Sequence, residues 1–150
     1  MRFKVPDPDF EKRVRGSFNR QKLMSAIGAE LTRLLPGEAE ISLPYRDDLT
    51  QQHGFVHAGI IATIADTACG YAAFSLMPAD AAVLTVEYKI NLMSPAVGEL
   101  FLARGRVIRP GKTLSVCTAE VTAHDQGKSK PVATMLATMM ALINQAGLTG

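Results

Sequence analysis

The stretch that decides the fold is Ala58–Met77, AGIIATIADTACGYAAFSLM, twenty residues with a single charged side chain, Asp66. A span of about 20 apolar residues could cross a bilayer. A carboxylate at the bilayer centre costs about 2.5–3.5 kcal/mol, however, and no Lys or Arg lies close to either end. The sequence therefore predicts no membrane span but a buried helix, His57–Leu76, which Met77-Pro78 ends.

Strand-like segments surround this helix. Two short ones, Glu30–Leu35 and Glu38–Pro44, precede it and are joined by Pro36-Gly37, a turn in which Pro presets φ and Gly supplies a positive φ. Four longer ones follow it, and the polar residues 124–130 separate the last two. Consecutive strands around one helix favour an α+β fold with an antiparallel sheet. The four later segments are Val83–Met93, Glu99–Ile108, Thr113–Ala123 and Val132–Asn144.

Two of these strands carry informative apolar patterns. Residues alternate along Val83–Met93, which predicts one apolar face. The last strand, Val132–Asn144, is apolar on both faces, so we expect a further layer to cover it, most simply a second subunit. The predicted apolar face of the earlier strand consists of Leu84, Val86, Tyr88, Ile90 and Leu92.

The N-terminal region has a helical pattern instead. Apolar residues recur at spacings of three to five over residues 9–27, which predicts a helix with a break at Gly16-Ser17 and a stop at Gly28. We expect residues 1–28 to form a helical extension and residues 29–146 to form the main α+β unit. With 150 residues in total, the chain is predicted to be a single domain.

Charge and cysteine content exclude several classes of protein. The 16 basic and 14 acidic residues give a net charge of +2, too even for a dedicated nucleic-acid-binding protein. Cys69 and Cys117 form neither a CxxC pair nor a Cys/His ligand pattern, so we expect no disulfide scaffold and no metal site. The first nine residues contain no apolar signal-peptide core. These features favour a reducing cytoplasmic setting.

Asp66 lies on an unusual face of the central helix. On a helical wheel its neighbours are small, and the opposite face carries the bulky Ile and Tyr side chains. A carboxyl in such an apolar setting has a raised pKa, which suits a general base. Pairing with a loop amide or with an Arg of a partner subunit is an equally open reading. The small residues are Gly59, Ala62, Thr63, Cys69, Gly70 and Ala73.

The start of the same helix is a second candidate element. The first turn of a helix leaves N–H groups unpaired at the positive end of the helix dipole. Those of Ala58, Gly59 and Ile60 could stabilise a developing oxyanion, or could simply be solvated or capped by the loop.

These residues together resemble a known family. Residues 51–59, QQHGFVHAG, with Asp66 nine residues after His57, resemble the signature of PaaI-type acyl-CoA thioesterases of the hotdog superfamily. That signature reads Asn-x-x-Gly-x-x-His-Gly-Gly, then Asp nine residues after the His. The strand 84–96 and the turn 109–113 are also similar to that family. The resemblance covers residues 20–145 and implies an antiparallel sheet wrapped around one long helix. It also implies a homodimer or homotetramer with active sites at the subunit interface.

The resemblance also implies roles for single residues. Asp66 corresponds to the acid that acts as base or nucleophile on the thioester, and Thr85 to a Ser/Thr that assists it. Gln51 corresponds to an orienting asparagine, although a shift of one residue to Gln52 stays open. His57 corresponds to the motif histidine, which we expect to brace the loop. Ala58, with Gly59 beside it, corresponds to the glycine whose N–H polarises the carbonyl.

The substrate implied by the resemblance is an acyl-CoA, without a metal or a dissociable cofactor. Arg109, Gly111, Lys112 and Thr113 resemble the turn that meets the coenzyme A moiety. Candidates for the acyl pocket are Phe55, Phe74 and Met93. Gln and Ala stand where the signature has Asn and Gly, so a non-catalytic acyl-CoA-binding or lipid-binding hotdog module is the alternative. A hotdog hydratase is a weaker third reading.

Overall fold

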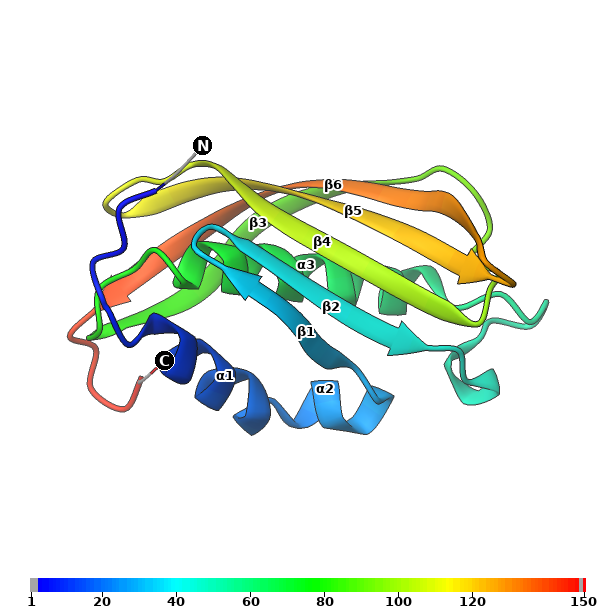
Figure 1. The fold of residues 1–150 in the computed structure, drawn as a ribbon, viewed down its shortest axis with the longest axis horizontal. Coiled ribbons are helices and arrows are strands. Elements are labelled where there is room, and N and C mark those ends of the chain that lie inside the picture. The colour runs from blue at the N-terminus through cyan, green and yellow to red at the C-terminus, as the bar shows by residue number, and fades with distance from the viewer. Residues whose placement is uncertain (1–2, 149) are drawn as a thin grey trace.

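One antiparallel sheet of six strands curves around a long helix, α3 (Ala58–Phe74), in the computed structural model of the chain, which describes residues 3–148 and 150 (Figure 1). The strand order is β1-β2-β4-β5-β6-β3, so β1 and β3 form the two edges. The predicted α+β fold, with a sheet wrapped around one helix, is confirmed. The strands are β1 (Glu30–Leu35), β2 (Glu38–Pro44), β3 (Ala81–Leu92), β4 (Leu100–Arg109), β5 (Leu114–Asp125) and β6 (Lys128–Ile143).

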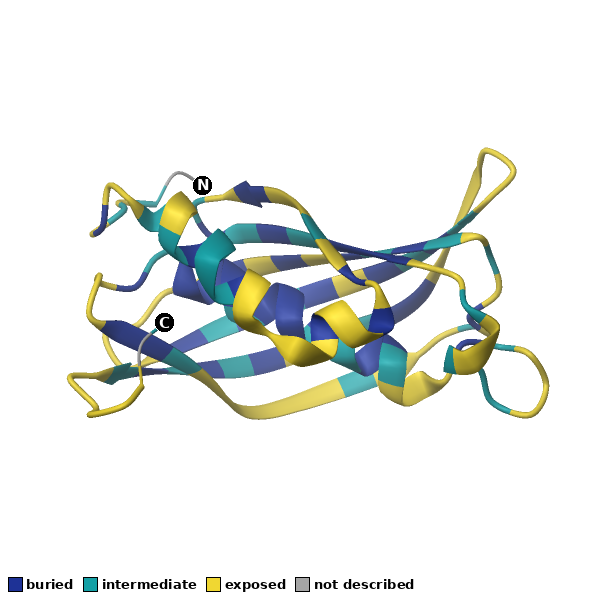
Figure 2. Cartoon of the chain, turned by 90° about the horizontal axis from the view of Figure 1, so that it is seen from below, coloured by how far each residue is buried: buried dark blue, intermediate teal, exposed yellow. Residues whose placement is uncertain are grey.

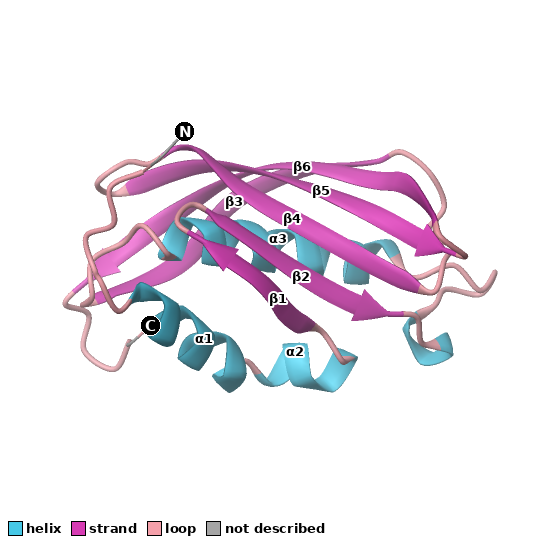
Figure 3. Cartoon of the chain, viewed as in Figure 1, coloured by secondary structure: helices cyan, strands magenta, loops and turns pink. Residues whose placement is uncertain are grey.

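Two short helices cover the side of α3 that faces away from the sheet (Figure 3). They are α1 (Phe10–Arg20) and α2 (Lys22–Ile27), and a 3-10 turn, η1 (Asp47–Leu49), precedes α3. Val14 and Phe18 of α1 are buried in the same hydrophobic core as the strands. The N-terminal region is therefore packed against α3 and shares its core.

Several boundaries match their predictions. Strands β1 and β2 have the predicted limits, and Gly37 in the turn between them has a φ of 78°. Gly28 ends α2 in the left-handed conformation, as expected of a helix stop. Helix α3 is shorter than predicted at both ends, because His57 is its N-cap and Phe74 is its last residue.

Two turns were predicted wrongly. The N-terminal helix breaks at Gln21 rather than at Gly16-Ser17, since Gln21 has an extended backbone (ψ 102°) between α1 and α2. The polar residues 124–130 are not a seven-residue connection, because β5 and β6 continue into them as far as a two-residue turn at Gln126-Gly127. Both turn residues have positive φ, 46° and 77°, which matches the twist of a tight hairpin.

A bulge in β3 overturns its predicted single apolar face. The register with β6 shifts between Thr85 and Glu87, so that Val86 is the extra residue. Before the bulge, Thr85 pairs with Met139, a buried residue facing α3, and Leu84 therefore faces the other side of the sheet. After the bulge, Tyr88 and the alternate residues that follow it face α3. The bulge places Thr85 on the same side as the central helix.

A glycine in β4 sets how closely α3 lies on the sheet. A Cβ atom built on Gly105 would lie 2.3 Å from the backbone C and O of Ala68 and 2.6 Å from the N of Cys69. The absence of a side chain at Gly105 therefore lets the helix backbone contact the strand directly. Ala65, Ala68 and Ala72 of α3 are fully buried. The close contact with β4 at Gly105 leaves room only for small side chains in the middle of α3.

Candidate active site

Asp66 lies midway along α3 and faces β3. The Thr85 hydroxyl donates a hydrogen bond to Oδ1 of Asp66 over 2.8 Å. Burial raises the pKa of the Asp66 carboxyl above its ordinary value, and the Thr85 hydrogen bond opposes this shift in part. The structure thus joins two residues that the resemblance paired, and gives the carboxyl the desolvated setting predicted from its small neighbours.

The small-residue face of α3 is only partly open. Asp66 shares a strip of incomplete burial with Thr63 and Gly70, whereas Ala62, Cys69 and Ala73 are buried against the rest of the molecule. The strip leads along the helix from Asp66 towards the exposed Gly59 in the first turn.

The first turn of α3 divides its N–H groups unequally. The N–H of Gly59 donates to Nδ1 of His57 over 2.8 Å, and the N–H of Ile60 donates to the His57 carbonyl. The N–H of Ala58 makes no hydrogen bond within residues 3–148 and 150. Of the predicted oxyanion donors, Gly59 is therefore engaged in capping the helix and Ala58 is free.

The side chains of Gln51 and Gln52 have different surroundings in the loop before α3. The Oε1 of Gln51 accepts a hydrogen bond from the backbone N–H of His53, and the Gln51 N–H donates to the Phe55 carbonyl over 2.9 Å. Gln52 is exposed and its amide lies beside the His53 ring. The loop backbone thus holds the Gln51 side chain, whereas the Gln52 side chain is exposed; which of the two takes the asparagine position stays a prediction.

A cavity of about 380 Å³ opens beside Ala58. Gln51 is one of its few polar lining residues, and no charged residue lines it. Of the three predicted acyl-pocket residues, Phe55 and Met93 line this cavity, whereas Phe74 is fully buried elsewhere. The remaining lining comes mainly from apolar side chains that were not predicted, namely Val56, Ile61, Leu92, Pro95, Ala96 and Val132.

Asp66 and Ala58 are too far apart to act on one carbonyl within a single chain. They are separated by eight residues, which at about 1.5 Å per residue is roughly 12 Å along the helix axis. A base acting through one water and an oxyanion donor must both lie about 3 Å from their targets. Within one chain the predicted residues therefore form two separate groups, Asp66 with Thr85 and Ala58 with Gln51, and we refer to each group as a half-site.

The predicted coenzyme A turn lies at the other end of α3. Gly111 and Lys112 line a cavity of about 450 Å³ together with Ala73 and Met77, near the C-terminus of the helix, whereas Ala58 lies at its N-terminus (Figure 1). Arg109 and Thr113 are exposed beside this turn. The requirement for glycine at 111 is steric, because its Cβ would lie 1.9 Å from the Leu114 carbonyl oxygen.

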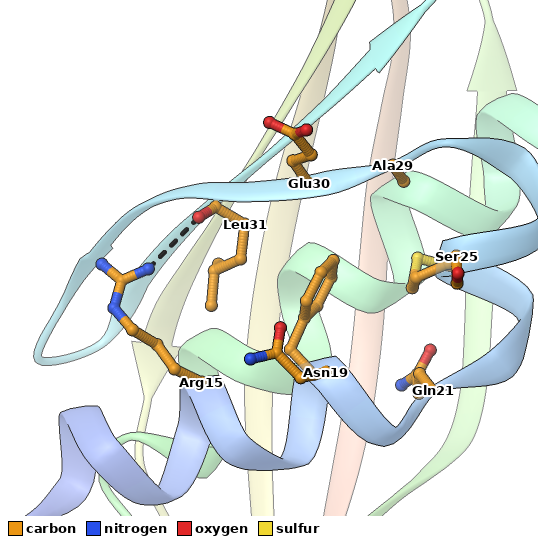
Figure 4. A pocket seen from close by; sticks show the side chains of 9 residues that line it. Arg15, Asn19, Gln21, Ser25, Ala29, Glu30 and Leu31 are labelled. Carbon is orange, nitrogen blue, oxygen red and sulfur yellow. Dashed lines mark hydrogen bonds between the residues drawn. The ribbon is translucent and has the colours of Figure 1, made fainter.

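A further cavity, of about 530 Å³, lies between α1, α2 and β1. Figure 4 shows Arg15 reaching across it to the Leu31 carbonyl, a hydrogen bond of 3.2 Å, with Asn19 beside it. Neither half-site contributes to its lining. We assign no role in the chemistry to this cavity.

Other chemical groups in the described residues are inert or dispersed. Cys69 and Cys117 are free and buried, and burial raises the pKa of both thiols well above neutrality. Residues 3–148 and 150 contain no cluster of three or more His, Cys, Asp or Glu side chains that could hold a metal ion. No helix within those same residues has the length and apolar character needed to span a membrane.

A long helix wrapped by a six-stranded antiparallel sheet is the architecture of a hotdog protein. The family model for the thioesterase superfamily matches residues 53–130, more than half of the chain. The chain belongs to this superfamily.

Individual proteins of this superfamily and its fold are similar to the chain in sequence or in structure. A thioesterase family protein from Silicibacter pomeroyi is 54% identical, with a TM-score of 0.89, covering 90% of this chain and 99% of that one. The PaaI protein of E. coli, from the phenylacetic acid degradation operon, has the same fold, with a TM-score of 0.81 at 20% identity over 97% of this chain and 99% of its own. A 1,4-dihydroxy-2-naphthoyl-CoA hydrolase of Listeria monocytogenes is 25% identical over 100 residues, 67% of this chain and 81% of the relative.

Proposed function

We propose that this protein hydrolyses an acyl-CoA to a free carboxylic acid and coenzyme A. The observation that carries the proposal is the partly desolvated Asp66 carboxylate, held by Thr85 on an otherwise small-residue helix face. Membership of the thioesterase superfamily gives the thioester as the bond to be cleaved. The Listeria relative, a CoA thioester hydrolase by name, supports coenzyme A as the leaving group.

A second copy of the chain would complete each active site at the free edge of β3. Antiparallel pairing of two β3 edges lays the first half of one strand beside the second half of the other. Thr85, which holds Asp66, lies in the first half, and Leu92, which lines the cavity beside Ala58, lies in the second. The pairing therefore brings Asp66 of one protomer towards Ala58 and Gln51 of its partner.

The chemistry then follows from these two half-sites. Asp66 takes a proton from a water whose oxygen attacks the thioester carbonyl, and the free N–H of the partner's Ala58 stabilises the resulting oxyanion. The carbon–sulfur bond breaks, and the coenzyme A thiolate takes the proton back from Asp66. In the nucleophilic alternative, Asp66 attacks the thioester carbonyl carbon, the carbon–sulfur bond breaks and coenzyme A leaves as the thiolate. Water then cleaves the mixed anhydride to the carboxylic acid and the Asp66 carboxylate, and the proton released goes to the thiolate.

The remaining predicted residues have supporting roles in the proposal. Gln51 orients the water or the thioester with its amide, and His57 holds the helix start so that the Ala58 N–H stays free. Arg109, Lys112 and Thr113, with the turn at Gly111, would meet the phosphates of coenzyme A, since Arg and Lys are suited to phosphate. The two unpaired cysteines favour action in the reducing cytoplasm.

The proposal is tested with a panel of acyl-CoAs from acetyl to palmitoyl, with phenylacetyl and benzoyl added. Free thiol is followed by a colorimetric reagent, and Asp66→Asn is assayed alongside. Thiol release that the mutation removes would support the enzyme and identify its acyl class. Saturable acyl-CoA binding without thiol release from any substrate would overturn it in favour of the non-catalytic binding module, for which the Gln51 and Ala58 departures from the signature are the motive.

A further inference from the structure

The cavity of about 530 Å³ between α1, α2 and β1 has an apolar floor and a polar rim. Phe18 and Met24 are buried at its base, and the partly buried Leu31 of β1 packs against the same core. Figure 2, which views the molecule from the side of α1 and α2, shows that the segment joining these helices is exposed, so the rim is open to solvent. Sites for small molecules have volumes of about 300–1,000 Å³ and combine apolar walls with a few polar groups. The exposed rim residues are Asn19, Gln21 and Ser25.

Arg15 is held over this cavity with part of its guanidinium unused. Its Nε donates to Glu11 over 3.0 Å, and its Nη1 donates to the Leu31 carbonyl over 3.2 Å (Figure 4). These two hydrogen bonds fix the plane of the group, whereas Nη2 donates to no acceptor in the part of the chain that the structure describes. A guanidinium that is already ordered loses little conformational freedom when it binds an anion.

A second free donor lies next to Arg15. Asn19 is four residues further along α1, and residues at this spacing lie one above the other on the same face of a helix. Figure 4 shows the Asn19 amide on the same side of α1 as Arg15. That amide makes no hydrogen bond to any of residues 3–148 or 150. Arg15 and Asn19 therefore offer N–H groups together to the oxygens of one ligand, at the edge of the apolar floor.

The charges around the cavity favour an anion. Arg15 and Glu30 are the charged residues of its lining. Glu30 and Leu31 follow each other in a strand, so their side chains point to opposite faces, and Figure 4 shows the Glu30 carboxylate pointing away from Arg15 and Asn19. Glu11, which pairs with Nε of Arg15, does not line the cavity. Among the described residues, therefore, a cation and an amide point into the cavity and a carboxylate does not.

We infer that this cavity is a binding site for a monocarboxylic acid with an apolar body. The carboxylate accepts hydrogen bonds from Nη2 of Arg15 and from the Asn19 amide, and the body lies over Phe18, Met24 and Leu31. A neutral apolar compound would gain only the floor, and a very short acid would gain only the two donors. The acid released in the proposed function belongs to this class, so the inference rests on that function only for the source of the ligand.

The floor and rim of the cavity both contact Tyr71 of α3. The Phe18 and Tyr71 rings lie 5.7 Å apart, centre to centre, in an edge-to-face arrangement. Gln21 donates from Nε2 to the Tyr71 hydroxyl over 3.1 Å. A ligand that lies against Phe18 therefore changes the surroundings of Tyr71, which gives a spectroscopic signal of binding. The other two tyrosines, Tyr45 and Tyr88, are exposed and do not line the cavity.

Octanoate is the probe that tests this site. It is titrated into the isotope-labelled 150-residue chain, and binding is followed by the amide chemical shifts and by the near-ultraviolet circular dichroism of Tyr71 in a Tyr45→Phe, Tyr88→Phe background. The shifts should concentrate in residues 15–31 and saturate with a Kd on the order of 0.1 mM. Octan-1-ol lacks the charge and acetate lacks the apolar body, so each should bind at least about tenfold more weakly.

Substitutions at Arg15 separate the charge of the side chain from its geometry. Arg15→Met should weaken octanoate binding by about tenfold or more, because the ionic donor is lost. Arg15→Lys keeps the charge without the planar fork and should give an intermediate Kd. Lys12→Met removes an exposed charge of α1 outside the cavity, so it is the matched control and should keep the wild-type Kd. The circular dichroism of the free variants shows that each is folded.

The binding test separates this inference from the proposed function, because it requires no turnover. Asp66→Asn should bind octanoate at residues 15–31 as the wild type does. Octanoate binding there by a chain that cleaves no acyl-CoA would keep the site and overturn the proposed function. Thiol release from an acyl-CoA, with octanoate shifts confined to the cavity beside Ala58, would overturn the site and keep the function. Equal affinities of the wild type and Arg15→Met for octanoate, or of the wild type for octanoate and octan-1-ol, would also overturn the site.

Discussion

The two ends of α3 are held in opposite ways. At the C-terminal end, the Arg13 guanidinium donates to the carbonyls of Phe74 and Met77 over 3.3 and 2.9 Å, and pairs with the buried Asp7 over 2.7 Å. It also lies 4.2 Å from the centre of the Phe74 ring. At the N-terminal end, an exposed loop supplies one cap from His57 and leaves the N–H of Ala58 free.

The contrast indicates that the two ends of α3 have different roles, one in stability and the other in the proposed function. Carbonyls left over at a helix C-terminus need donors, and Arg13 supplies them together with a favourable charge for the dipole. Ala58 at the other end is exposed, its N–H has no hydrogen-bond partner among the described residues, and in the proposed function that N–H binds the oxyanion. Anchoring α3 firmly at one end allows the other end to stay open without loosening Asp66 between them. Changes at the two ends should therefore separate stability from activity.

The largest effect is expected from the middle of the helix. Asp66→Asn removes the base and should lower kcat by about 10²–10⁴-fold. Because burial raises the Asp66 pKa, the stability that this carboxyl contributes is present below its unfolded pKa and is lost as pH rises through its folded pKa. At neutral pH the Asn variant should therefore melt at the same temperature as the wild type or higher, as measured by calorimetry.

The control for Asp66→Asn is the same comparison of melting temperatures at low pH. Below about pH 4 the wild-type carboxyl is protonated, and the difference in melting temperature should disappear. A variant that melts much earlier at pH 7 would show that Asp66 is a structural partner, the reading left open by the sequence.

Arg13→Met breaks the C-terminal anchor. It keeps an apolar stem but removes the donors to Phe74 and Met77 and leaves Asp7 without its ion pair. Removing one partner of a buried pair is strongly destabilising, so we expect the melting temperature to fall by about 10 °C. At a temperature where the variant is folded, kcat should stay close to wild type, because the anchor is far from the half-sites.

A surface pair offers the matched control for that change. Arg15 and Glu11 form an exposed ion pair on the same helix, and Arg15→Met should change the melting temperature by much less. If the Arg13 and Arg15 variants lose equal stability, the anchor has no special role in holding α3.

The contacts of Arg13 at the C-terminal end of α3 could not have been predicted from the sequence. Elements with local signals were predicted well, since Pro36-Gly37 bounds β1 and β2 and a nearly uncharged run of twenty residues contains α3. The two carbonyls that accept from Arg13 lie 61 and 64 residues away, and nothing local predicts that Arg13 and no other basic residue of α1 contacts them. Long-range contacts of this kind follow from packing and have no periodic signature.

The candidate site shows the same limit. Motif spacing predicted Asp66 and Ala58 as parts of one site, but helix geometry separates them along the axis of α3. The bulge at Val86, which turns Thr85 towards Asp66, depends on the ladder with β6 and interrupts a pattern that alternates perfectly in the sequence. Gln126 likewise adopts a positive φ that a non-glycine residue rarely shows.

Thr85→Val tests how the Thr85 hydroxyl affects the pKa of Asp66. Loss of the hydroxyl removes the hydrogen bond that lowers the Asp66 pKa, while the burial that raises it remains. The acidic limb of the kcat profile should therefore move to higher pH. Thr85→Ser keeps the donor and should keep the wild-type limb. If the Val variant is slower by the same factor at every pH, Thr85 positions substrate and does not tune the acid.

The smallest effect is expected at the N-terminal cap. His57→Ala removes the acceptor for the Gly59 N–H and should cost about 1 kcal/mol, whereas His57→Asn can accept the same hydrogen bond and should retain most of that stability. Since the proposed role of His57 is to brace the loop, kcat should follow the cap: near wild type in the Asn variant and lower by no more than about fivefold in the Ala variant. A loss of a hundredfold in both variants, measured with the best acyl-CoA, would mean that the imidazole itself takes part in the chemistry. The proposal that His57 acts only by bracing the loop, so that the Ala58 N–H stays unpaired, would then be wrong.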